Sequence, residues 1–194
     1  MTTIIGLSGS LRQHSYNTAL LRAAAALMPA GASLDVRTIH GIPLYNADDE
    51  AAHGNPAPVR DLKAAIAAAD GLLLATPEYN NSIPGVFKNA IDWLSSDTDE
   101  SVPPIFTGKP VALIGASPTR FGTLLSQAAW LPVLRTLETK PWFGDRLMVP
   151  HANKVFDADG RIVDAAIQER LRKFIAGFVE FTAGAGRHRP AGME

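Results

Sequence analysis

Short apolar runs alternate with helix-type patterns along most of this chain, and this alternation constrains the fold more than any other feature. We expect strands at 3–7, 34–39, 71–75, 110–114 and 146–149. Between them, apolar residues recur every three to four positions and predict helices at 17–28, 58–69, 84–94, 124–137 and 162–182. Such alternation is typical of parallel sheets covered on both faces. The sequence therefore predicts an α/β fold with a five-stranded, doubly wound parallel sheet, and a long polar loop at 40–57.

The composition indicates a single soluble domain. The 194 residues are 46% apolar and 19% charged, and no stretch approaches the roughly 20 apolar residues of a membrane-spanning helix. The net charge is −1 and no basic stretch interleaves with aromatics, so we expect neither a nucleic-acid surface nor a membrane. We expect one domain over 1–183, a polar tail at 184–194, and a cytoplasmic location. The absence of cysteine excludes thiol chemistry, so any redox activity needs a bound cofactor.

The junction between the first strand and the first helix contains the residue types of an anion site. A helix N-terminus has unpaired N–H groups and the positive end of the helix dipole. Ser10, Arg12, Ser15 and Asn17 add side-chain donors, and Arg12 can hold two phosphate oxygens at once. The spacing matches neither a Walker loop nor a Gly-x-Gly-x-x-Gly fingerprint. The alternative is an ordinary helix cap, because Ser, Thr and Asn are common in that role.

Two further loops leave strands at the same edge of the predicted sheet. In open parallel sheets, ligands bind beyond the carboxyl ends of the strands, where the strand order reverses. Within residues 77–83, Tyr79 can stack on a flat ring and Asn80 can bond its polar edge. A third loop follows at 115–122. A phosphate site beside a ring site indicates a mononucleotide, although Asn-rich segments also form plain turns.

Several short segments resemble one known family. They are Gly9-Ser10-Leu11-Arg12, Ser15-Tyr16-Asn17, Pro77-Glu78-Tyr79-Asn80, Ser82-Ile83-Pro84-Gly85, Phe87-Lys88-Asn89-Ala90-Ile91-Asp92-Trp93 and Gly108-Lys109-Pro110-Val111. In these segments the chain is similar to the NADPH-dependent FMN reductases. The resemblance implies a flavodoxin-like fold with strand order 2-1-3-4-5 and bound FMN. It also implies NAD(P)H as hydride donor and a small acceptor such as a quinone, free flavin, azo compound or metal oxyanion.

The resemblance also assigns ten residues to the cofactor. Those implied around the FMN phosphate are Ser10, Arg12, Ser15, Tyr16 and Asn17. Those implied along the ribityl chain and isoalloxazine are Pro77, Glu78, Tyr79, Asn80 and Ser117. Members form dimers or tetramers, so we expect a homodimer or homotetramer. The chain has Gly-Thr-Leu-Leu at 122–125, where many relatives have paired glycines and an arginine, which weakens the inference of a tetramer.

The expected chemistry needs no acidic or nucleophilic side chain, because the protein's task is to hold nicotinamide against flavin. We therefore predict no catalytic residue. We also predict no metal site, since the five histidines have no metal-binding spacing. Two alternatives stay open, a flavodoxin-type electron carrier and a flavin-binding regulatory module, neither of which oxidises NAD(P)H directly. Two interpretations of Arg120 stay open. It contacts the NADPH phosphate or an acidic partner surface, or it is a solvated loop residue.

Overall fold

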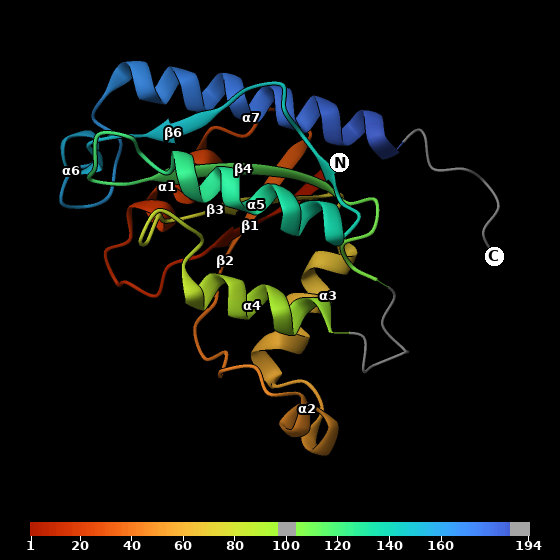
Figure 1. Cartoon of the computed structure of the whole chain (residues 1–194). Helices are drawn as coiled ribbons and strands as arrows, with labels where there is room; N and C mark the ends of the chain where they lie inside the picture. Colours follow the sequence, from red (N-terminus) through yellow and green to blue (C-terminus); the bar gives the residue numbers. More distant parts are fainter. Residues whose placement is uncertain (97–103, 187–194) are drawn as a thin grey trace.

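The computed structural model describes residues 1–96 and 104–186, which form a parallel β-sheet between two layers of helices (Figure 1). The strands are β1 (Thr2–Ser8), β2 (Ala32–Thr38), β3 (Gly71–Ala75), β4 (Pro110–Ala116), β5 (Lys140–Pro141) and β6 (Leu147–Val149). Their order is β2-β1-β3-β4-β5, and β6 also pairs with β4. The order reverses beside β1, which lies between β2 and β3. This confirms the predicted flavodoxin-like fold and places the ends of β1 and β3 together.

The last position of the sheet differs from the prediction. A single strand was expected at 146–149, but β5 and β6 share this place, pairing with the beginning and the end of β4 respectively. The N–H of Trp142 still donates to the carbonyl of Val111 at 2.8 Å, after which the chain leaves the sheet until Leu147. This detour contains Gly144, where a Cβ atom would lie 2.6 Å from Nε1 of Trp142. The edge strand is therefore interrupted rather than continuous.

The helices are α1 (Tyr16–Ala26), α2 (Ala47–His53), α3 (Ala57–Ala68), α4 (Gly85–Ser95), α5 (Leu124–Thr136), α6 (Ala152–Val155) and α7 (Ala165–Gly186). All five predicted helices are present, and α7 continues to Gly186, into the segment that was expected to be a tail. The rest of that expected tail, 187–194, lies outside the described residues, as does 97–103 of the connection before β4. No helix among the described residues is long and apolar enough to cross a bilayer.

The two faces of the sheet bury separate apolar layers. Helices α1 and α7 cover one face and α3, α4 and α5 cover the other; Figure 1 shows α7 above the sheet and α4 below it. Successive residues of a strand point to opposite faces, so Ile4 and Leu73 join the first layer whereas Ile5 and Leu72 join the second. The uninterrupted apolar runs of the central strands follow from this double burial.

We predicted a polar loop at 40–57, but the structure has helix α2 within this segment. The prediction was therefore wrong for Ala47–His53. The helix has the sequence Ala-Asp-Asp-Glu-Ala-Ala-His and no apolar stripe, so periodicity gives no signal for it. It is held by polar contacts instead: buried Glu50 accepts hydrogen bonds from Tyr45 Oη at 3.1 Å and Ser96 Oγ at 2.6 Å. The bond to Glu50 raises the pKa of the Tyr45 phenol.

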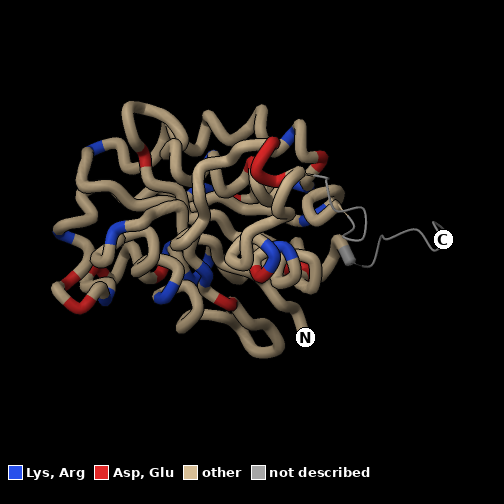
Figure 2. The backbone as a smooth tube through the Cα atoms, turned by 90° about the horizontal axis from the view of Figure 1, so that it is seen from below, with Lys and Arg blue, Asp and Glu red and all other residues tan. Residues whose placement is uncertain are grey.

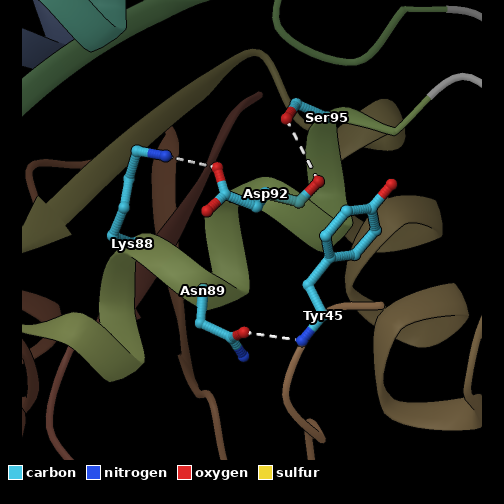
Figure 3. A network of polar contacts seen from close by, with 5 residues as sticks. All are labelled: Tyr45, Lys88, Asn89, Asp92 and Ser95. Carbon is cyan, nitrogen blue, oxygen red and sulfur yellow. Dashed lines mark hydrogen bonds and ion pairs between the residues drawn. The ribbon is translucent and has the colours of Figure 1, made fainter. Parts of the chain in front are cut away.

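Helix α4 fixes the segment that precedes α2 (Figure 3). The side chain of Asn89 accepts a hydrogen bond from Tyr45 N at 2.8 Å and donates one to the Pro43 carbonyl at 2.8 Å. Trp93 Nε1 donates to the same carbonyl at 3.0 Å. On the same helix Lys88, which directly precedes Asn89, forms an ion pair with Asp92. Around the rest of the molecule, acidic and basic residues both occur along the chain (Figure 2).

Candidate functional site

A cavity lies where β1, β3 and β4 end. It is lined by Ser10, Arg12, Ser15, Tyr16, Asn17, Pro77, Glu78, Tyr79, Ala116, Ser117 and Pro118. All the residues that the sequence assigned to the cofactor are in this set except Asn80. The three loops meet there although they are far apart in the sequence, because parallel strands send their carboxyl ends to one edge of the sheet. Ala116 and Pro118 lie in the predicted third loop but were not assigned to the cofactor, because neither residue type carries a chemical signal of its own.

The N-terminus of α1 opens into the cavity with unused donors. Ser15 caps the helix, and its Oγ accepts the N–H of Thr18 at 3.3 Å. Among the described residues, the N–H groups of Tyr16 and Asn17 have no hydrogen-bond acceptor. The Ser15 hydroxyl can still donate its own proton. The sequence left open whether this segment caps a helix or binds an anion. In the structure Ser15 caps α1, and the N–H groups that remain at the same helix start suit a phosphate.

The loop before α1 adds the positively charged side chain of Arg12 to the cavity. Ser10 is buried, and its Oγ accepts the N–H of Arg12 at 3.3 Å. The Arg12 side chain is exposed and forms no ion pair within 1–96 and 104–186. His40, which follows β2, lies with its Nε2 3.2 Å from the Leu11 carbonyl and ties this loop to the neighbouring strand end. The backbone of this loop is thus fixed, and the Arg12 guanidinium is available to an anionic ligand.

The side chain of Asn17 makes a contact that its sequence motif does not reveal. Its carboxamide is paired with the backbone of Ala116, through Nδ2 to the carbonyl at 3.0 Å and from the Ala116 N–H to Oδ1 at 2.9 Å. This pairing uses the carboxamide oxygen and one of the two Nδ2 hydrogens, so the role of Asn17 as a side-chain donor to phosphate stays a prediction. Its backbone N–H keeps its place in the open first turn of α1.

The second loop forms a miniature hairpin. Tyr79 and Ser82 exchange backbone hydrogen bonds of 3.2 and 3.0 Å, and both central residues have positive φ, 50° at Asn80 and 61° at Asn81. Such a two-residue turn favours Asn for its conformation alone. The turn reading of this segment is therefore confirmed, while Tyr79 lines the cavity with 44% of its surface exposed. The role of Asn80 as a cofactor contact stays a prediction.

Glu78 makes a contact that the sequence did not reveal. Its Oε2 accepts the N–H groups of Leu125 at 2.8 Å and Ser126 at 3.0 Å, so it caps α5, whose own N-cap residue Thr123 makes no side-chain cap bond. Next to it, buried Thr76 Oγ1 accepts a bond from Trp130 Nε1 at 3.0 Å. The second loop is thereby fixed to the start of α5.

The third loop is held by bonds within itself and to α6. Ser117 Oγ accepts the N–H of Thr119 at 3.2 Å, and the Thr119 carbonyl accepts the N–H of His151 at 3.1 Å. The Arg120 guanidinium carbon lies 4.4 Å from the ring centre of Phe121, which is 58% exposed. Arg120 therefore rests on an aromatic face at the same edge of the sheet as the cavity.

Comparison with known proteins identifies the family. The model of the NADPH-dependent FMN reductases matches residues 2–154. The chain belongs to this family. It is 44% identical over 170 residues to an NAD(P)H-dependent FMN reductase of Pseudomonas aeruginosa, covering 88% of this chain and 89% of the relative. It is 39% identical over 181 residues to a 2-hydroxy-1,4-benzoquinone reductase of a Burkholderia species, covering 93% and 94%.

A solved structure supports the same assignment. The flavoenzyme NAD(P)H:(acceptor) oxidoreductase FerB of Paracoccus denitrificans superimposes with a TM-score of 0.82 and 31% identity, over 95% of this chain and 99% of that one. Membership in the FMN reductase family confirms the expected enzyme class and the expected cofactors, FMN and NAD(P)H. Between the readings left open by the sequence, it favours the enzyme over the electron carrier.

Proposed function

We propose that the cavity binds FMN and that the enzyme passes electrons from NAD(P)H to a small quinone. The observation that carries this proposal is the coincidence of an unpaired Arg12 with the open N–H groups of Tyr16 and Asn17 in one cavity. When bound, FMN supplies the hydride acceptor and the electron donor for the second substrate. A quinone is favoured because relatives covering over nine tenths of this chain are named quinone reductases, including that of Escherichia coli at 35% identity.

The residues of the cavity divide into two groups in this proposal. Around the phosphate we place the hydroxyl and guanidinium donors of the first loop and the first-turn N–H groups, contributed by Ser10, Arg12, Ser15, Tyr16 and Asn17. Along the ribityl chain and the ring we place Pro77, Glu78, Tyr79, Asn80 and Ser117. Tyr79 offers its half-exposed ring to a flat ligand. None of these side chains has to exchange a proton, so the protein acts by binding and orienting.

Anaerobic rapid mixing tests the proposed activity. Protein loaded with FMN is mixed with NADH or NADPH, and the flavin absorbance is followed before and after addition of 1,4-benzoquinone. We expect bleaching at a rate that accounts for turnover, and recovery of the colour on adding the quinone. Steady-state rates should give parallel double-reciprocal lines, since donor and acceptor use the site in turn. An electron carrier or a regulatory module would be bleached far more slowly than any turnover requires.

We also propose that the protein is a cytoplasmic homodimer or homotetramer that assembles through α5. Large apolar side chains are exposed on this helix and beside it: Leu124, Leu125, Leu131, Phe121 and Phe143, between 44% and 71%. Light scattering coupled to gel filtration measures the assembly. We expect a mass of two or four chains, and a single-chain mass for Leu131→Lys. A single-chain mass for the wild-type protein would contradict the proposal.

A further inference from the structure

The pairing of Asn17 with Ala116 joins two parts of the cavity that are 99 residues apart in sequence. The carboxamide oxygen accepts the Ala116 N–H at 2.9 Å and the carboxamide nitrogen donates to the Ala116 carbonyl at 3.0 Å. Both residues are almost fully buried, with 4% of Asn17 and 3% of Ala116 exposed. A primary amide satisfies a peptide's donor and acceptor together only in this paired orientation. The side chain is therefore fixed by two hydrogen bonds, and little of it is exposed.

Ala116 needs this partner because its neighbouring strand has already ended. The pairing of β3 with β4 stops at Ala75 and Ile114, and the last bond runs from the Thr76 N–H to the Ile114 carbonyl at 2.9 Å. The N–H and C=O of Ala116, two residues further along β4, point to the same side as those of Ile114. The Asn17 carboxamide takes the place that a continued β3 would occupy. A buried peptide would otherwise lose both hydrogen bonds.

The two partners belong to different loops of the proposed flavin site and meet within it. Asn17 is the second residue of α1, whose open N–H groups face the proposed phosphate position. Ala116 directly precedes Ser117, which lines the proposed ring position. The pairing thus ties the start of α1 to the start of the third loop.

From this geometry we infer that Asn17 is a positioning residue, whose side chain holds the phosphate loop and the third loop in register and is not a phosphate ligand. The inference rests on the proposed FMN site. It separates Asn17 from Arg12, although both belong to the same sequence motif. The side chain of Arg12 acts on the phosphate alone, whereas the side chain of Asn17 holds two loops of the cavity together.

Comparing FMN with riboflavin tests the inference, because riboflavin has the same ring and ribityl chain but no phosphate. Dissociation constants of both flavins are measured by fluorescence titration for the wild type, Arg12→Ala and Asn17→Ala. We expect Asn17→Ala to weaken both flavins by the same factor, about tenfold, because two buried peptide groups lose their partner. The preference for FMN over riboflavin should be unchanged. Arg12→Ala should instead reduce that preference at least about tenfold and leave riboflavin binding unaltered.

The contrary results are equally distinct. If Asn17→Ala lowers the preference for FMN while riboflavin binding is unchanged, the side chain is a phosphate ligand and the inference is wrong. If neither flavin is affected, the pairing has no positioning role and the inference is also wrong. If the wild type binds neither flavin, the proposed function itself fails.

A second variant keeps the test decisive if Asn17→Ala does not fold. Asn17→Asp has the same shape and keeps an acceptor for the Ala116 N–H, but cannot donate to the Ala116 carbonyl when ionised. Riboflavin alone is used, so that repulsion between the new carboxylate and a phosphate plays no part. We expect weaker riboflavin binding than in the wild type, together with faster hydrogen exchange of the Ala116 amide in the flavin-free protein. Unchanged riboflavin affinity would overturn the inference.

Discussion

Glu78 caps helix α5 from a distant loop, with its carboxylate 2.8 Å from the backbone nitrogen of Leu125. The same oxygen, Oε2, also accepts the Ser126 N–H at 3.0 Å, at the positive end of the helix dipole. The same residue lines the cavity. Binding of a ligand there and the stability of α5 are therefore linked through one carboxylate.

Glu78→Ala should destabilise the flavin-free protein by about 1 to 2 kcal/mol, because the first turn of α5 loses its cap. Glu78→Gln keeps an acceptor without the charge, so its loss should be smaller. Urea unfolding of the flavin-free proteins measures both. Glu180→Ala, at an exposed position of α7, is the matched control and should change the free energy of unfolding by less than about 0.5 kcal/mol. Equal effects of Glu78→Ala and Glu180→Ala would contradict the capping role.

Arg12→Ala should weaken FMN binding by about 1.5 to 3 kcal/mol, since a charge-assisted contact to the phosphate is lost. The remaining affinity should depend less on salt concentration than that of the wild type. Calorimetric titration with FMN at two ionic strengths measures both effects. Arg22→Ala removes an equal charge from the exposed side of α1 and serves as the control. An Arg12 variant that binds FMN as tightly as the Arg22 variant would refute the phosphate assignment.

Tyr79→Ala should disturb flavin binding and the visible flavin spectrum more than it disturbs folding, because 44% of the side chain is exposed beside the cavity. Tyr79→Phe keeps the ring and should retain both properties. Absorbance spectra of the FMN-loaded variants, compared with their thermal unfolding curves, make the distinction. If the spectrum and affinity of Tyr79→Ala equal those of the wild type, the residue has only a role in the turn.

Asn81→Ala should cost about 1 kcal/mol of stability, because alanine at a φ of 61° lacks the polar side chain that eases this conformation. Asn81→Gly should be close to neutral, since glycine adopts positive φ without strain. Thermal unfolding of the flavin-free variants ranks the two substitutions. Destabilisation of Asn81→Gly by as much as Asn81→Ala would show that the Asn81 side chain is needed for a contact rather than for its backbone conformation.

The sequence predicts the parts of this protein that are governed by local pattern. The central strands carry continuous apolar runs because both of their faces are buried, and the three loops that line the cavity follow directly from where those strands end. Helix α2 was missed since it is anchored by buried Glu50 rather than by an apolar face. The divided edge strand was missed because β5 is only two residues long.

The roles of individual polar side chains were harder to predict. Asn17 and Glu78 occur in a cofactor-type motif, but in the structure their polar groups bind the backbone of β4 and α5. Their partners are 99 and 47 residues away, so no local spacing encodes these bonds. By contrast, the first-turn N–H groups of α1 could be predicted from a strand running into a capped helix, because every helix start has them.

The divided edge strand limits the ways in which copies of this protein can associate. An outer strand of two short pieces gives an incoming chain little backbone to hydrogen-bond, which protects against strand addition. At the opposite rim, β2 presents Asp35 and Arg37, paired at 2.7 Å and about half exposed. Both edges of the sheet thus disfavour edge-to-edge strand pairing between molecules, so self-association has to use the helical surfaces.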